Sequence, residues 1–464
     1  MTATSGRTVA GARAPRARGS TTGSSTIAFH APQPGHWPSH PEAGRPHSWH
    51  TQVVRRALST TVVSEVDNPG RARHDAGVDA LAAELQALEA AGLRRHLRPL
   101  GSASDAEVLC EGRRLLLLSS NNYLGLATHP ALRAAATAAI ARYGCGTGAS
   151  RLIAGHLELH AEVEAKLAAF KGTPAALLFP SGYQANVGAI TALVGRGDHV
   201  FSDALNHASI IDGCRLSGAT IHVYPHRDVT ALERLLDAAP QDARRLIVTD
   251  SVFSMDGDRA PLGPLVALAE TYHSWLLVDE AHATGVLGPC GAGLAEAEGL
   301  TGRIAVHVGT LGKALGGAGA YVAGAAELIA LLVNRARSFV YTTGLAPAAV
   351  AAAGAALDVV AAEPERRRAL ERNAAHLREG LRALGLDARG DTHIVPLMVG
   401  DNRRALALAE ALFARGVHAL AIRPPTVPPG TARLRVTPMA THSAVQLERA
   451  LGAFRDAARE SGVI

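Results

Sequence analysis

The feature that most constrains the fold is a regular alternation of short apolar runs with helical stretches through the middle of the chain. Each apolar run has the length of one strand, and each connection has room for a helix. Because parallel strands need such crossover connections, the pattern predicts an α/β fold with a large, mostly parallel sheet that helices cover on both faces. Ligands of such sheets bind at the carboxyl ends of the strands. The predicted strands are Ala175–Phe179, His199–Phe201, Ile221–Tyr224, Leu246–Val248, Trp275–Val278 and Ala305–Val308.

The segment before this region divides into a tail and an arm. Residues 1–75 are rich in Ser, Thr, Pro, Gly, Arg and His without hydrophobic periodicity, which predicts a disordered tail. Its few acids are also typical of an organelle transit peptide, and a non-functional extension or a mis-assigned start codon fits equally. Residues 76–118 form an N-terminal arm, in which spaced leucines predict an amphipathic helix over 78–97 that packs on a larger body, before a strand at 115–118.

Two domains are expected after the arm. The large α/β domain spans 119–346, and a smaller α+β domain spans 347–464, where long Ala/Leu/Arg/Glu helices alternate with short strands. The helices are expected at 348–361, 365–384 and 403–415, and the strands at 393–399 and 432–436.

Charge and composition exclude several classes of protein. The net charge is +5, and residues 1–75 hold nine Arg against four acids, 9 − 4 = +5, so the body is neutral and no nucleic-acid partner is expected. The four cysteines lie far apart and predict buried free thiols in a reducing, cytoplasmic compartment and no metal site. No apolar run has the length of a membrane span, so no membrane association is expected.

Lysine is scarce, which narrows any amine chemistry: only Lys166, Lys171 and Lys313 occur. The first two belong to a helix over 158–170 and its exit, where a solvated surface role is expected. Lys313 follows an apolar strand in a loop of small residues, from which its amine can reach a ligand. An ATP-binding phosphate loop is excluded here, because His307 and Ala314 stand where that motif requires Gly and Ser or Thr.

Three further motifs follow predicted strands. Asp279 and His282 end the run Trp275–His282, and an Asp in that place can keep the pyridine nitrogen of pyridoxal 5′-phosphate (PLP) protonated. Small residues at Ser181 and Gly182 begin a helix whose bare amides suit a phosphate. His207 follows the strand at 199–201, where its ring can stack on a planar cofactor. The glycines at 144–148 lack the spacing of a dinucleotide site, so NAD is not expected.

With these motifs in order, the chain resembles the α-oxoamine synthases, which are PLP enzymes of fold type I. The resemblance runs from about residue 93 to 454 and rests on a series of specific stretches. They are Ser120–Leu126, Gly146–Arg151, Ser181–Asn186, Asn206–Ser209, Asp250–Asp258, Val278–Gly285 and Gly309–Lys313.

The resemblance implies a role for each matching residue. Lys313 would bind PLP as a Schiff base and move protons, Asp279 would pair with the pyridine nitrogen, and His207 would stack on the ring. His282 and Ser254 would lie near the phenolic oxygen of the ring. The phosphate would be held by Ser181, Gly182, Tyr183 and Thr310, with Thr343 reaching the phosphate of a neighbouring subunit in a homodimer. Substrate contacts are expected from Arg423, which would hold the amino-acid carboxylate, and from Arg94, Asn121 and Thr426.

The closing stretch Ala421–Arg435 is similar to the biotin-pathway members of this family. The similarity implies L-alanine and pimeloyl-CoA, or a pimeloyl carrier protein, as substrates that condense with loss of CO2. Ala283 stands where a Gly commonly follows the His of this motif, a departure that bears on the substrate assignment. The alternatives are another α-oxoamine synthase with a different acyl-CoA or amino acid, an aminotransferase of the same fold, and a catalytically inactive scaffold.

Overall fold

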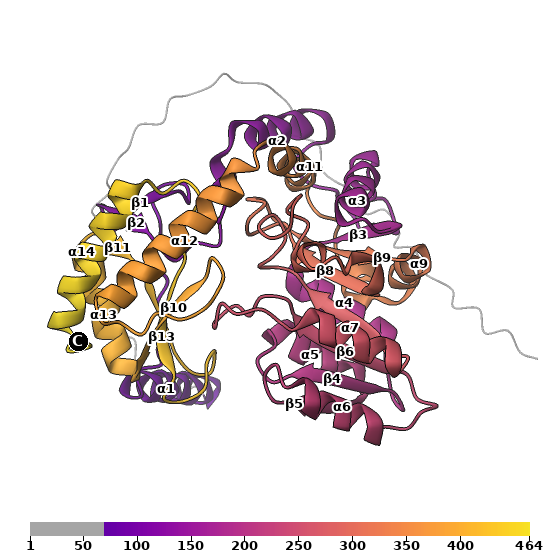
Figure 1. Cartoon of the computed structure of the whole chain (residues 1–464), viewed down its shortest axis with the longest axis horizontal. Helices are drawn as coiled ribbons and strands as arrows, with labels where there is room; N and C mark the ends of the chain where they lie inside the picture. The colour runs from indigo at the N-terminus through magenta and orange to yellow at the C-terminus, as the bar shows by residue number, and fades with distance from the viewer. Residues whose placement is uncertain (1–68) are drawn as a thin grey trace, which may run out of the picture. The chain divides into compact units, whose positions relative to one another are not determined.

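The computed structural model describes residues 69–464, with side chains from residue 78 onward. Its largest feature is a seven-stranded sheet in the order β3-β9-β8-β7-β6-β4-β5 (Figure 1). The strands β4 to β8 pair in parallel, and β9 pairs antiparallel with both β3 and β8. The strands are β3 (Ala175–Phe179), β4 (His199–Asp203), β5 (Thr220–Tyr224), β6 (Arg245–Asp250), β7 (Trp275–Asp279), β8 (Val306–Thr310) and β9 (Ala320–Gly324).

Helices cover both faces of this sheet because successive side chains of a strand point to opposite faces. Leu177 and Phe179 of β3 pack with α4, α5, α9 and α10, while Leu178 between them packs with α3 and α11. On that second face α6 and α7 cover β6 and β7. The helices of this part are α2 (Pro130–Tyr143), α3 (Glu158–Lys171), α4 (Gly182–Leu193), α5 (Ala208–Ser217), α6 (Val229–Ala238), α7 (Leu262–Thr271), α8 (Leu294–Ala297), α9 (Ala326–Arg335), α10 (Arg337–Val340) and α11 (Pro347–Ala362), with 3-10 turns at Leu126–Thr128 and Thr301–Arg303.

The C-terminal part contains two small sheets, and α12, α13 and α14 lie together on one side of β10 and β13 in Figure 1. Its core includes the fully buried Leu377, Leu408 and Phe454, one from each of these helices. Strand β2 pairs in parallel with β11, so a strand of the N-terminal arm belongs to this part, which the sequence did not predict. The elements are β1 (Glu107–Cys110), β2 (Arg113–Leu117), β10 (Val395–Gly400), β11 (Val417–His418), β12 (Leu420–Ile422), β13 (Ala432–Val436), α12 (Glu365–Ala383), α13 (Asn402–Ala414) and α14 (Ala444–Glu460).

The structure confirms the predicted α/β class with its mostly parallel sheet. The six predicted strands of that sheet are present within a residue or two of their expected bounds, whereas β9 was missed. Of the tail predicted at 1–75, residues 1–68 lie outside the described part, and 69–75 belong to helix α1 (Pro69–Ala90). The domain limits at 118 and 346 remain predictions.

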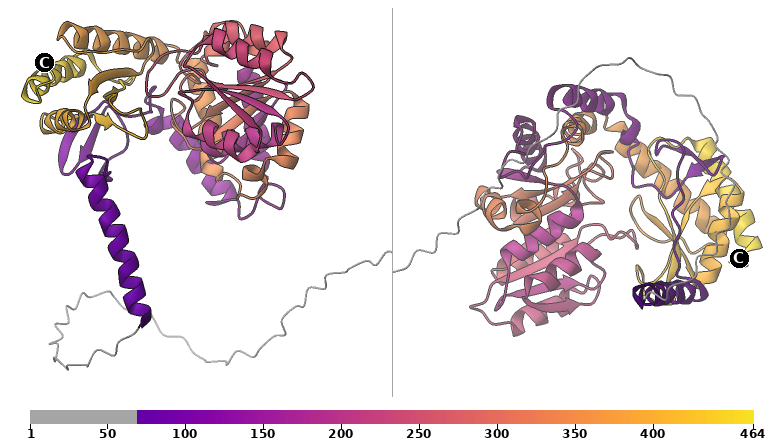
Figure 2. Two further views of the ribbon diagram at one scale, coloured as in Figure 1. Left: turned by 90° about the horizontal axis from the view of Figure 1, so that it is seen from below. Right: turned by 180° about the vertical axis from the view of Figure 1, so that it is seen from behind.

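Two predictions about the arm and the cysteines were wrong. Helix α1 (Pro69–Ala90) ends earlier than expected, because Gly92 has a positive φ of 65° that stops the helix. Its Leu81 is 62% exposed, so this helix does not bury its apolar face in the chain (Figure 2). All four cysteines are free, but Cys145 and Cys290 are exposed rather than buried.

Among residues 69–464, no single helix is long and apolar enough to cross a membrane. Helices α11 and α12 pass that test only as a pair bent by 79°.

Candidate active site

Acidic and hydroxyl side chains gather at one edge of the large sheet. Asp203, Asp250, Asp279 and Thr310 are the last residues of β4, β6, β7 and β8, and Asp250 lies beside Asp279 in the register. These four strands are parallel, so their carboxyl ends meet at the same edge. This is the edge at which the sequence predicts a ligand site.

Lys313 lies in the loop that leaves β8 at this edge, and its Nζ lies 2.9 Å from Nε2 of His282. Burial lowers the pKa of Lys313 to about 8, although the carboxylate of Asp279 opposes that shift. A substantial fraction of this amine is therefore neutral near pH 7 to 8 and able to act as a nucleophile or base. The loop depends on Gly316, which has a φ of +66° and lies so close to the backbone of Ala127 that a Cβ would stand 2.4 Å from its nitrogen.

His282 connects Lys313 to a tyrosine and an arginine from other parts of the chain. Its Nδ1 lies 2.7 Å from Oη of Tyr123, which accepts a 2.9 Å hydrogen bond from Arg435 and donates one of 3.0 Å to Asn121. Because the Tyr123 hydroxyl donates its proton to Asn121, it can only accept from His282, so the ring proton of His282 lies on Nδ1. Nε2 of His282 is therefore unprotonated and accepts a hydrogen bond from the Lys313 amine. Burial holds the pKa of His282 well below its usual value, which keeps this ring neutral.

Arg435 lies in the same cluster. Its Nη1 donates to Asn121 at 3.1 Å, and its Nε donates to the carbonyl of Ser254 at 2.6 Å. These bonds join β13 to the loop after β6 and to the segment around Asn121. With one N–H of each nitrogen used in these bonds, Nη1 and Nη2 each keep a second N–H that can donate to a carboxylate in the cluster of Lys313.

A second network links Asp279 to His207. Asn186 donates to Asp279 Oδ2 at 2.6 Å and to Ser209 Oγ at 2.9 Å, and the Ser209 hydroxyl lies 2.7 Å from Nδ1 of His207. Since His207 Nδ1 also accepts from the Ser209 amide, the hydroxyl donates to it, and the ring proton lies on Nε2. Burial lowers the pKa of His207, so its ring is a neutral imidazole. Asp279 is 4% exposed.

The residues expected to hold a phosphate lie at the start of α4 and the end of β8. Ser181 is the N-cap of α4 and accepts from the Gln184 amide, so the helix presents its free amides and positive end here. Tyr183 is half exposed and donates to Asp212 at 2.6 Å. Thr310 accepts from the Gly312 amide at 3.2 Å in the Lys313 loop.

The structure does not bring every expected residue to Lys313. Thr343 is exposed and forms a bridge with Ser150. Arg94 lies near Glu89 at the end of α1, and no hydrogen bond within residues 78–464 joins it to the cluster of Lys313. Arg423 donates to the carbonyl of Gly92 in the same region, and Thr426 closes a turn onto the Arg423 carbonyl.

Lys171 was expected on the surface, and this prediction was wrong. The side chain is 1% exposed and pairs with Glu280, which is 0% exposed and follows Asp279 in the chain. Lys171 also donates to the carbonyl of Ala292, and the amide of Ala295 donates to the same carboxylate. The sequence shows Lys171 at a helix end, and only the tertiary fold turns this end inward against β7.

Several residues of the site were missed or left in the background by sequence reasoning. Tyr123, Asn186 and Asp250 lie inside stretches that carry the family resemblance, and Arg435 is the last residue of another such stretch. These motifs could therefore have identified all four residues as candidates for the site. Asp250 is 3% exposed and accepts from the His207 amide at 2.7 Å. Burial and the nearby Asp279 raise the pKa of Asp250 well above its usual value.

These residues fit PLP. The cluster offers an amine with a lowered pKa, a buried carboxylate held by an amide, a neutral histidine and a helix start with free amides, all at one sheet edge. These four groups match the aldehyde, pyridine nitrogen, ring face and phosphate of that cofactor.

Comparison with known proteins agrees with this geometry. Residues 113–454 match the family described as aminotransferase class I and II. The chain is 54% identical over 387 residues to 8-amino-7-oxononanoate synthase of Geobacter sulfurreducens, covering 83% of this chain and 99% of the relative. It is 56% identical over 378 residues to the synthase of that name from Anaeromyxobacter dehalogenans, covering 81% and 95%.

Solved structures are similar as well. A serine palmitoyltransferase from S. paucimobilis, solved with PLP, has a TM-score of 0.80 at 36% identity and covers 84% of this chain and 99% of its own. An 8-amino-7-oxononanoate synthase from Francisella tularensis has a TM-score of 0.64 at 28% identity and covers 75% and 98%.

Proposed function

The chain belongs to the aminotransferase class I and II family, and on that premise we propose that it is an α-oxoamine synthase with PLP as its cofactor. It condenses L-alanine with pimeloyl-CoA, or with a pimeloyl carrier protein, and forms 8-amino-7-oxononanoate, CoA and CO2 in biotin synthesis. The observation that carries the proposal is the identity of more than half of the aligned positions with synthases of that name over more than four fifths of the chain.

When bound, PLP supplies an electron sink for a carbanion at the α-carbon of the amino acid. Lys313 would bind it covalently, Asp279 would hold its pyridine nitrogen, and His207 would cover the ring. The start of α4, at Ser181 and Gly182, would hold its phosphate.

The side chains around Lys313 would then position the substrate and move its protons. The neutral amine of Lys313, hydrogen-bonded to Nε2 of His282, takes the α-proton of alanine. We propose that Arg435 holds the alanine carboxylate, because its guanidinium lies in the cluster of Tyr123 and Asn121, whereas Arg423 is bound to the carbonyl of Gly92. The carbanion attacks the thioester carbonyl, CoA leaves, and the carboxylate departs as CO2 before a proton returns to the carbon.

An assay of purified protein with PLP, L-alanine and pimeloyl-CoA tests this function. Free CoA thiol and CO2 should appear in equal amounts, and omission of alanine should abolish both. A fold type I aminotransferase would instead convert alanine with an oxo acid to pyruvate and leave the thioester intact. Pyruvate formation without release of CoA therefore contradicts the proposal, and a panel of other acyl-CoAs and amino acids identifies a different α-oxoamine synthase.

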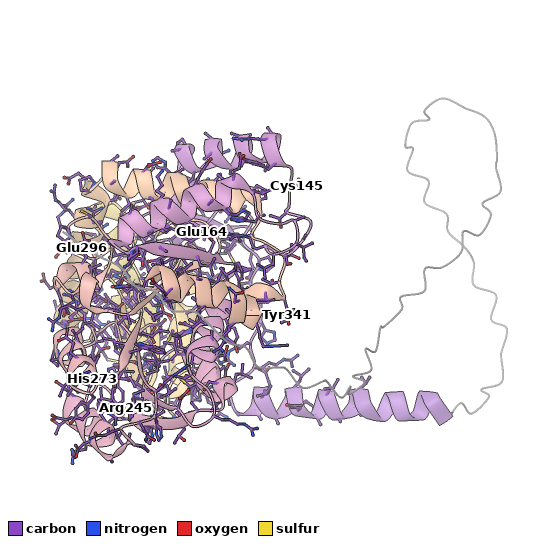
Figure 3. The ribbon with its side chains drawn as sticks, turned by 90° about the vertical axis from the view of Figure 1, so that its right-hand side faces the viewer. Cys145, Glu164, Arg245, His273, Glu296 and Tyr341 are labelled. Atoms are coloured by element: carbon purple, nitrogen blue, oxygen red, sulfur yellow. The ribbon has the colours of Figure 1, made fainter. Side chains whose placement is uncertain are left out.

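We also propose that the enzyme is a cytoplasmic homodimer. Leu152, Ile153 and Tyr341 are 50%, 81% and 72% exposed, and the bridge between Ser150 and Thr343 brings their two segments together. Exposed apolar side chains that gather in this way are typical of a protein interface. Figure 3 places Tyr341 and Cys145 at the same edge of the molecule. Thr343, two residues after Tyr341, is expected to reach a second copy. Four free cysteines fit a reducing compartment. The molar mass by light scattering should be that of two chains, and Ile153→Asp should shift it toward one chain, with Leu216→Asp as an exposed control.

A further inference from the structure

A basic pocket shares His393 with the surroundings of the Lys313 cluster, and the reaction proposed above does not use it. Its volume is about 700 Å³, and it lies between the loop after β7 and helix α12. Four arginines line it, namely Arg259, Arg367, Arg368 and Arg378, against two acids, Glu371 and Asp391. The pocket therefore carries an excess of positive charge.

Polar atoms in this pocket are buried without a hydrogen-bond partner among the described residues. Both ring nitrogens of His393 have none, although the residue is 3% exposed, and Nε of Arg259 and of Arg378 have none either. Burying such groups without partners is costly, so nearly all of them in folded proteins are satisfied by protein, water or a ligand. Their concentration in the lining of one basic cavity indicates that a polar, negatively charged group belongs there.

The nearest counter-charge does not satisfy these arginines. The Asp391 carboxylate lies 3.9 Å from Nε of Arg259, which is a charge contact without a hydrogen bond, and only the Asp391 carbonyl accepts from Nη2 of Arg259, at 3.3 Å. Arg378 uses one terminal nitrogen on the carbonyl of Thr392. Burial lowers the pKa of His393 to about 3, so its ring is neutral and offers one donor and one acceptor.

The pocket is close to the reacting groups. The ring of His393 packs against Tyr123 with 4.1 Å between the centroids, and Tyr123 is hydrogen-bonded to His282, which contacts Lys313. Only two side chains therefore separate the pocket wall from the catalytic amine. A ligand group in this pocket belongs to a molecule whose other end can reach the active site.

We propose that this pocket binds an oxyanion of the acyl donor, either the free carboxylate of its acyl chain or a phosphate of its carrier arm. This inference rests on the proposed function, because that reaction needs a donor that carries both groups. Carboxylates and phosphates share the oxygen geometry that Arg recognises with paired hydrogen bonds. Alanine is too short to occupy this pocket and the site at Lys313 together.

The experiment uses the PLP-loaded enzyme and three variants on α12. Arg378→Gln removes a partly buried guanidinium whose Nε has no partner among the described residues, and Arg368→Gln removes an exposed one that lines the same pocket. Arg372→Gln is the matched control, because Arg372 is exposed on the same helix and does not line the pocket. Calorimetry measures the binding of pimelate and of CoA separately. Kinetics compare pimeloyl-CoA with heptanoyl-CoA, which lacks the distal carboxylate, as substrate or competitive inhibitor.

Each outcome has one meaning. If the pocket takes the carboxylate, Arg378→Gln raises the KM for pimeloyl-CoA and weakens pimelate binding about tenfold or more, while heptanoyl-CoA is unaffected. If it takes a phosphate, both thioesters and CoA lose affinity together. In either case the KM for alanine and the visible absorbance of bound PLP remain at their wild-type values.

Unchanged affinity for pimelate, CoA and both thioesters in Arg368→Gln and in folded Arg378→Gln overturns the inference. If Arg378→Gln does not fold, Arg368→Gln decides, since its exposed side chain carries little of the fold. CoA release by the wild-type enzyme shows separately whether the proposed function itself fails. The wild type would then release no CoA from pimeloyl-CoA, while Arg-dependent binding of pimelate or CoA would still be present.

Discussion

The stability of the enzyme should depend on pH through His226, which lies between β5 and α6. Its Nδ1 lies 3.0 Å from Asp203 Oδ1 and its Nε2 lies 2.9 Å from Asp258 Oδ2, so one ring bridges two carboxylates. Arg227 also contacts Asp258 at 3.1 Å, and the edge of the ring faces Phe253. Burial opposes the charged ring, but the two hydrogen-bonded carboxylates outweigh it and raise the pKa of His226 to about 9.

The sign and size of the effect follow from linkage. A raised pKa means that the folded state binds the proton more tightly, so the stabilisation is complete below the unfolded pKa near 6.5 and is lost as the pH rises through about 9. The shift of roughly 2.5 units corresponds to about 3 kcal/mol at pH 6. His226→Gln should therefore lower the free energy of unfolding by about that amount at pH 6 and by little at pH 10.

Urea unfolding of the PLP-loaded enzyme at pH 6, 8 and 10 measures this difference. His376→Gln is the control, because that ring is 45% exposed and, among residues 78–464, forms an ion pair with Glu448 alone, so its loss should cost less than about 1 kcal/mol. A difference between wild type and His226→Gln that stays constant from pH 6 to pH 10 would refute the reasoning.

The Ser254 carbonyl, which accepts a hydrogen bond from Arg435, lies in the loop that Asp258 anchors through His226. The KM for alanine should therefore rise in His226→Gln as well.

Three further predictions concern the buried site. Lys313→Ala should abolish CoA release and the visible absorbance of the Schiff base between this lysine and PLP, and a borohydride-reducible lysine adduct in this variant would contradict the assignment. Arg435→Lys should lower kcat/KM for alanine roughly 10- to 150-fold, because Lys cannot reproduce a bidentate carboxylate contact, whereas Arg423→Lys should change it less than about threefold. The reverse order would restore the sequence-based assignment to Arg423. Lys171→Met should destabilise the fold by about 3–5 kcal/mol in thermal or urea unfolding, because the buried Glu280 carboxylate loses its lysine counter-charge, and adding Glu280→Gln should recover part of that loss. Equal stability of Lys171→Met and wild type would show that Glu280 is neutral in the folded state.

The sequence alone identified the strands of the large sheet and the residues that follow them. The reason is local, since a buried parallel strand is a short apolar run, and its carboxyl end is marked by the first polar residue, as at Asp279 after Trp275–Val278. Lys313 was recognisable on the same ground, because it is one of only three lysines and follows such a strand. Strand β9 escaped this reasoning, because a short run rich in Ala and Gly has no distinct apolar pattern.

The tertiary structure alone decided which side chains meet across the chain. Arg435, Tyr123 and His282 come from three distant segments, and nothing in the sequence ranks Arg435 above Arg423 as the neighbour of Lys313. From the sequence, Lys171 is expected on the surface, whereas in the fold the end of α3 is buried and Lys171 pairs with Glu280. Among the described residues, the ring nitrogens of His393 and Nε of Arg378 lack partners only because the fold buries these atoms around one cavity. A sequence records local periodicity and residue chemistry, whereas burial and the pairing of charges depend on distances that exist only after the chain has packed.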